Sequence, residues 1–82
     1  MNARATLLSR MKANAAADWT IADVETLARE HGLAFVRGNG TSHCHLKHPA
    51  ARDMLTIPAR RPIKPVYIRK LVRYIETMGA NS

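Results

Sequence analysis

The chain has 82 residues, with 13 lysines and arginines against six aspartates and glutamates, and its formal net charge is +7. At this length the chain can bury only one small hydrophobic core, so we expect a single domain over residues 1–82. The single cysteine, Cys44, cannot form an internal disulfide, which excludes a disulfide-stapled secreted scaffold. The sequence contains no apolar run of the ~20 residues that span a membrane, and Leu7-Leu8 is too short for a signal-peptide core. We therefore expect a cytoplasmic protein with no membrane partner.

The excess positive charge is confined to the second half of the chain. Residues 1–33 hold four cations and four carboxylates, whereas residues 34–82 hold nine cations and two carboxylates. A one-sided basic field favours a polyanion or an acidic partner surface. The alternative is a basic protein whose charge serves solubility alone.

The first half of the sequence predicts two helices. Residues 3–14 have helix-favouring composition, with one apolar face formed by Leu7, Leu8 and Met11. Residues 14–18 either extend this helix or turn out of it. Thr20 and Asp23 form an approximate capping box at the start of a second helix, which ends at a C′ glycine, Gly32.

The middle of the sequence predicts three strands, over residues 33–37, 42–48 and 54–57. The first connection contains the turn signal Gly38-Asn39-Gly40. Because both connections are short, we expect an antiparallel meander.

The last predicted helix covers residues 66–78, with Pro65 at the first helical position. Projection at 100° per residue gives it a broad apolar face, formed by Tyr67, Ile68, Leu71, Tyr74, Ile75 and Met78. The opposite side carries Arg69, Lys70 and Arg73. The element order predicts an α+β fold, a three-stranded antiparallel sheet with helices packed on one face and an additional N-terminal helix.

The segment from Gly40 to His48 holds three of the four histidines and the only cysteine. Histidine and cysteine are the usual zinc ligands. On a strand, however, His43 and His45 face one side while Cys44 and His48 face the other, so the four cannot converge without a bulge. We therefore expect no metal site and no cofactor, and we expect Cys44 to pack inward.

Acid–base catalysis on RNA is a second hypothesis for this segment. RNA carries its own nucleophile, the 2′-hydroxyl, so its cleavage requires a base, an acid and cations that stabilise the charged phosphorane. An imidazole with an unperturbed pKa of ~6.5 can act as base or acid. His43 follows a glycine-rich turn, and His45 lies ~7 Å along the same strand face as the candidate second group. The alternative is that both are ordinary solvent-facing strand histidines.

Two linked motifs carry a resemblance to a known family. Gly40-Thr41-Ser42-His43 precedes the second predicted strand, and Thr56-Ile57-Pro58 and Ile63-Lys64-Pro65 precede the last helix. On these motifs, and over nearly its whole length, the chain resembles the HicA-type mRNA interferases, toxins of bacterial type II toxin–antitoxin pairs. One departure is Thr41, because many members have glycine directly before Ser-His.

This resemblance implies a fold like that of double-stranded-RNA-binding domains, with an additional N-terminal helix. It implies ribosome-independent endoribonuclease cleavage of mRNA, with His43 as the essential catalytic residue. It also implies a HicB-type antitoxin that covers the active surface and joins in repressing the operon, so that DNA is contacted only indirectly. The expected setting is the bacterial cytoplasm.

We assign RNA contact to residues of the turn, the second strand and the basic helix, namely Gly40, Thr41, Ser42, His45, Lys47, Lys64, Arg69, Lys70 and Arg73. For each of these a purely structural role is the alternative: turn geometry, a strand cap or a solvated face. The aromatic residues Trp19, Tyr67 and Tyr74 are expected in the core rather than as base-stacking platforms. Two other functions remain open. One is a non-catalytic RNA-binding module of the same fold, and the weaker is a DNA-binding module, for which the sequence lacks a helix-turn-helix pattern.

Overall fold

A computed structural model describes residues 6–37 and 43–79 of the chain. Within these ranges the elements follow in the order α1 (Leu7–Ala13), α2 (Ile21–Glu30), β1 (Ala34–Arg37), β2 (His43–Lys47), β3 (Leu55–Pro58) and α3 (Pro65–Gly79). The predicted α+β class is confirmed. Pro65 is the first residue of the last helix, as predicted.

The first helix is shorter than the predicted span of residues 3–14. Thr6 has an extended backbone, and its hydroxyl accepts a hydrogen bond from the Ser9 amide at 3.1 Å, so it caps a helix that begins at Leu7. At the other end the chain turns out of the helix after Ala13 instead of extending it. There the carbonyl of Asn14 accepts a 2.8 Å hydrogen bond from the Trp19 indole.

The strands form an antiparallel sheet in the order β1-β2-β3 within the described part of the chain, as expected for a meander. Side chains alternate between the two faces of a strand, so the register assigns each residue to a face. The inner face carries Phe35, Cys44, Leu46 and Ile57, and the outer face carries Val36, His43, His45 and Thr56. Cys44 is fully buried, which confirms the predicted strand orientation.

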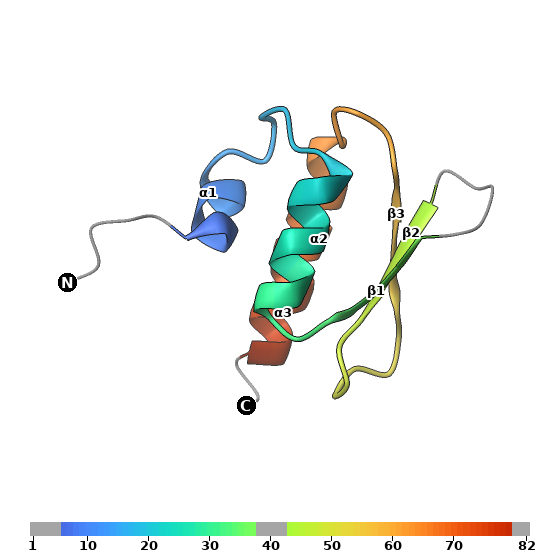
Figure 1. The fold of residues 1–82 in the computed structure, drawn as a ribbon. Helices are drawn as coiled ribbons and strands as arrows, with labels where there is room; N and C mark the ends of the chain where they lie inside the picture. Colours follow the sequence, from blue (N-terminus) through green and yellow to red (C-terminus); the bar gives the residue numbers. More distant parts are fainter. Residues whose placement is uncertain (1–5, 38–42, 80–82) are drawn as a thin grey trace.

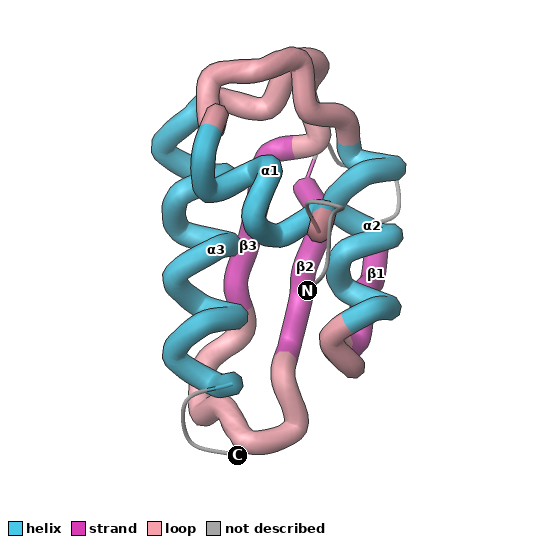
Figure 2. The backbone as a smooth tube through the Cα atoms, turned by 90° about the vertical axis from the view of Figure 1, so that its left-hand side faces the viewer, coloured by secondary structure: helices cyan, strands magenta, loops and turns pink. Residues whose placement is uncertain are grey.

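The molecule is built in layers (Figures 1 and 2). The sheet forms one layer, and α2 and α3 lie side by side on its inner face, where α2 packs against β1 and α3 against β3. In Figure 1, α1 lies beyond these helices, on the side away from the sheet, and it packs on α3. None of the described helices has the length and apolar character needed to cross a lipid bilayer.

One continuous core joins these layers. Its fully buried side chains come from all three helices and the sheet, including Met11, Val24, Leu27, Leu46, Ile57, Ile68 and Leu71. Trp19 is buried, and Tyr67 and Tyr74 are partly buried against the core, as predicted. Val72 lies outside the predicted apolar face of α3, yet it is only 5% exposed. Because α1 covers a second side of α3, the apolar face is wider than the sheet alone requires.

The second helix is fixed at both ends by the predicted signals. Thr20 and Asp23 form a reciprocal capping box at its start. After the helix, Gly32 has a φ of +73°, a conformation that glycine adopts without the steric cost of a Cβ. The chain therefore enters β1 in a defined direction.

Candidate functional site

His43 is exposed at the first position of β2, opposite Pro58 at the end of β3. The next residue, Cys44, is fully buried, and this anchors the start of the strand. Since neighbouring side chains of a strand point to opposite faces, burial of Cys44 directs His43 to the outer face. The imidazole therefore lies at one end of the sheet, where it can meet a ligand.

His43 borders a cavity of about 240 Å³ at this end of the molecule. The other lining residues come from β3, from the segment after it and from α3, and they are Pro58, Arg60, Lys64 and Tyr67. The cavity thus brings together the predicted catalytic histidine and Lys64, a predicted RNA-binding residue. A histidine that shares a cavity with two cations is suited to an anionic ligand that exchanges a proton.

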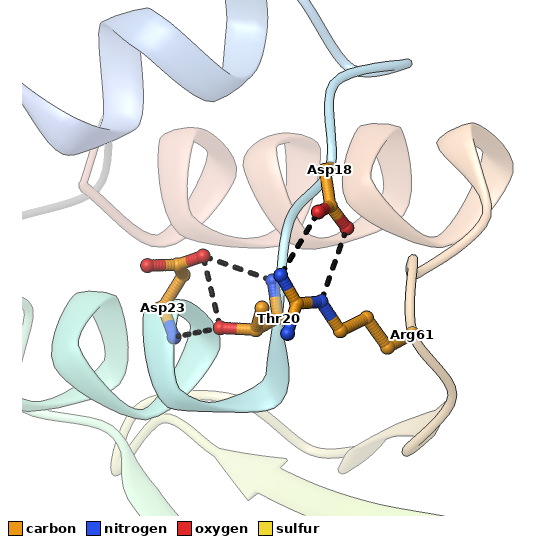
Figure 3. A network of polar contacts seen from close by, with 4 residues as sticks. All are labelled: Asp18, Thr20, Asp23 and Arg61. Atoms are coloured by element: carbon orange, nitrogen blue, oxygen red, sulfur yellow. Dashed lines mark hydrogen bonds and ion pairs between the residues drawn. The ribbon is translucent and has the colours of Figure 1, made fainter.

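The segment between β3 and α3, residues 59–64, is tied to the segment that precedes α2. Ile63 is 1% exposed in the core, and its amide donates a 3.0 Å hydrogen bond to the Trp19 carbonyl. Arg61 donates to the Asp18 carboxylate from Nη2 at 3.1 Å and from Nε at 3.4 Å (Figure 3). Hydrogen bonding to Asp18 and its negative charge raise the pKa of Arg61. These anchors place Arg60 and Lys64 at the cavity.

The capping box lies beside this anchor, as Figure 3 shows. The Asp23 carboxylate accepts from the Thr20 amide at 2.9 Å and from the Thr20 hydroxyl at 3.0 Å, while the Asp23 amide donates to the hydroxyl at 3.3 Å. These bonds fix the chain at the residue directly after Trp19. The carbonyl that holds Ile63 is therefore itself held in place.

His45 has different surroundings from His43, although both lie on the outer face. Its side chain is half-buried, and Nδ1 lies 3.0 Å from the hydroxyl of Thr56 on β3. His45 is not among the residues that line the His43 cavity. His45 is therefore a neighbour of His43 on the outer face of the sheet but does not line the same cavity.

Lys47 lies at the far end of β2 from His43. Its ammonium donates to the carbonyl oxygens of His48, at 3.2 Å, and Ala51. Lys47, a predicted RNA-binding residue, is thus hydrogen-bonded to the turn after β2. Gly40, Thr41 and Ser42, also assigned to RNA contact, lie outside the described residues.

Three further predicted RNA-binding residues, Arg69, Lys70 and Arg73, are exposed on α3. They line a separate groove of about 460 Å³ between α1 and α3. Lys70 also lies near a residue of the His43 cavity, because its Nζ is 5.8 Å from the centre of the Tyr67 ring.

Arg60 and Tyr67 line the cavity but were not among the predicted site residues. Arg60 carried a signal, since it lies between two residues of the resemblance motifs, Pro58 and Lys64. Tyr67 was assigned only to the core. Its partial burial agrees with that role, and the rest of its side chain borders the cavity.

Among the residues that the structure describes, no three histidine, cysteine, aspartate or glutamate side chains are grouped so that they could hold a metal ion. Comparisons of the chain with protein-family models, with curated proteins and with solved structures found no match. Its function is therefore inferred from its own residues.

Proposed function

We propose that this protein is a metal-independent endoribonuclease in which His43 acts as general acid or base. One observation carries the proposal: the exposed His43 shares a small cavity with two cationic side chains, Arg60 and Lys64. An imidazole exchanges protons near neutral pH, and neighbouring cations stabilise the extra negative charge of a phosphorane. Both are required for cleavage of an RNA phosphodiester.

The chemistry follows from the 2′-hydroxyl of the substrate. A base removes the 2′ proton, the 2′-oxygen attacks the adjacent phosphorus, and the bond from phosphorus to the 5′-oxygen breaks as that oxygen takes up a proton. The products are a 2′,3′-cyclic phosphate and a 5′-hydroxyl end. In this scheme His43 transfers a proton, and Arg60 and Lys64 face the phosphate oxygens.

The proposal extends to a HicA-type toxin that cleaves mRNA in the bacterial cytoplasm and is neutralised by a HicB-type antitoxin. Two features support it. The order of a helix, three strands and a helix, preceded by one additional helix, agrees with what the resemblance implies. The histidine of the Gly-x-Ser-His motif, His43, lies at the cavity. An antitoxin that covered this cavity and the basic face of α3 would block substrate entry.

The test is cleavage of single-stranded RNA by purified protein in the presence of EDTA. We expect the unsubstituted protein to cleave, and His43→Ala to lower the rate by ~10²–10⁴-fold, the usual contribution of a general acid or base. His31→Ala is the matched control, because His31 is exposed at the end of α2 and does not line the cavity. It should retain full activity.

Two results would contradict the proposal. Full activity of His43→Ala would remove His43 from the chemistry. Tight RNA binding by the unsubstituted protein without cleavage, with and without added divalent cations, would identify a non-catalytic RNA-binding module.

A further inference from the structure

The groove between α1 and α3 combines an apolar floor with a cationic rim. Met11 and Val72 lie at its base, with exposed fractions of 0% and 5%, and Arg69, Lys70 and Arg73 form its exposed rim. A fourth cation, Lys12, is paired with Glu76 at 2.8 Å. The groove therefore offers three cations with no ion pair to another described residue.

The groove and the His43 cavity are both lined by residues of α3. Tyr67 lines the cavity, and Lys70, which lines the groove, lies over the Tyr67 ring. From Pro65 to Arg73 the helix advances only ~12 Å. A ligand of a few linked phosphates can therefore reach from one site to the other.

The spacing of the cations fits a polynucleotide strand. Arg69 and Arg73 are four residues apart on a helix, which places their Cβ atoms about 5–6 Å apart. Neighbouring phosphates of an extended strand have a similar separation. Val66, which is 47% exposed and also lines the groove, offers apolar surface to a base.

The extent of the cationic surface favours a single strand. Proteins that bind duplex RNA contact two successive minor grooves over ~16 base pairs. The rim cations of the groove lie within about two turns of α3, which matches a few linked phosphates of one strand. An acidic protein surface would also satisfy the cations of the groove, but the short distance along α3 between the groove and the His43 cavity favours a strand that occupies both sites.

We propose that the groove between α1 and α3 binds the flanking phosphates of a single-stranded RNA whose scissile bond lies at His43. This inference rests on the proposed function, because it takes His43 as the cleavage position. Arg69 and Arg73 then contact phosphates two to four nucleotides from that bond. Lys70 lies between the two sites, beside Tyr67.

The test compares kcat/KM for a dinucleotide with kcat/KM for strands lengthened on the 5′ side alone or the 3′ side alone. We expect lengthening on one side to raise kcat/KM until about four nucleotides have been added. The double variant Arg69→Gln, Arg73→Gln should lower cleavage of an octanucleotide roughly tenfold more than cleavage of the dinucleotide. Loss of two phosphate contacts should also reduce the slope of log affinity against log salt by about 1.4.

Arg29→Gln is the matched control, because Arg29 is exposed on α2 and pairs with Glu25. It should leave both substrates unaffected. Equal losses on short and long substrates in the double variant, or the same kcat/KM at all lengths, would overturn the inference.

Binding of a labelled octanucleotide, measured by fluorescence anisotropy, distinguishes failure of this inference from failure of the proposed catalytic function. If the unsubstituted protein cleaves no RNA, the double variant should still bind roughly tenfold more weakly. Unchanged binding would overturn the inference and would favour an acidic protein as the ligand of the groove.

Discussion

The two halves of the molecule use their charged side chains differently. In the first half, carboxylates serve the fold: Asp23 caps α2, Glu25 pairs with Arg29 on the same helix, and Asp18 holds Arg61. In the second half, most cations, including Arg60, Lys64, Arg69 and Arg73, make no ion pair with another residue of the described ranges. The paired charges of the first half stabilise the fold, whereas the unpaired cations of the second half support the proposed binding of a polyanion.

This difference predicts that substitutions of buried residues in the first half lower the free energy of unfolding, whereas substitutions of unpaired cations in the second half do not. Leu27 is fully buried on α2, so Leu27→Ala should lower the free energy of unfolding by ~2–5 kcal/mol through lost contacts and a residual cavity. Urea unfolding followed by circular dichroism measures the change. Arg60→Gln, at an exposed cation of the second half, should leave the unfolding midpoint unchanged. A midpoint unaffected by Leu27→Ala would contradict the assignment of α2 to the core.

Removing the cations of the cavity should change catalysis without changing stability. Arg60→Gln and Lys64→Gln should each lower kcat by ~10–100-fold, somewhat less than the ~10²–10³ of an enclosed oxyanion donor, because both side chains are exposed. Single-turnover cleavage measures the effect. Arg52→Gln, at an exposed cation between β2 and β3, is the control. Equal losses in all three variants would show that total charge, and not position at the cavity, determines the rate.

The smallest effect is expected on the second histidine of β2. His45 does not line the cavity, and its contact with Thr56 is a single hydrogen bond, so His45→Ala should change kcat less than about threefold. The same cleavage assay measures it. A loss as large as that of His43→Ala would identify His45 as the second proton-transfer group.

The sequence predicted most of the fold because its signals are local. The Thr20–Asp23 capping box, Gly32 and Pro65 each set one end of a helix through the backbone of neighbouring residues. Alternation along β2 correctly placed Cys44 inside the molecule. Burial of Val72 was missed because it depends on where α1 docks, and local periodicity contains no information on that contact.

The candidate site was harder to predict from the sequence than the fold. The strand position of His43 and its motif were visible, but the contribution of Arg60 depends on how residues 59–64 are anchored. That anchor joins Ile63 to Trp19, and Arg61 to Asp18, across more than forty positions of the chain. The hydrogen bonds from Lys47 to the carbonyl oxygens of His48 and Ala51 could not be predicted either, because they depend on the backbone conformation of the turn.

The chemical identity of the cleaved ends tests the central claim most directly. The account requires the 2′-hydroxyl to attack phosphorus, with His43 transferring a proton. Mass spectrometry of the fragments released in EDTA should therefore show a 2′,3′-cyclic phosphate on one fragment and a 5′-hydroxyl on the other. A 3′-hydroxyl paired with a 5′-phosphate would contradict the account, because those ends arise from attack by water and not by the RNA itself.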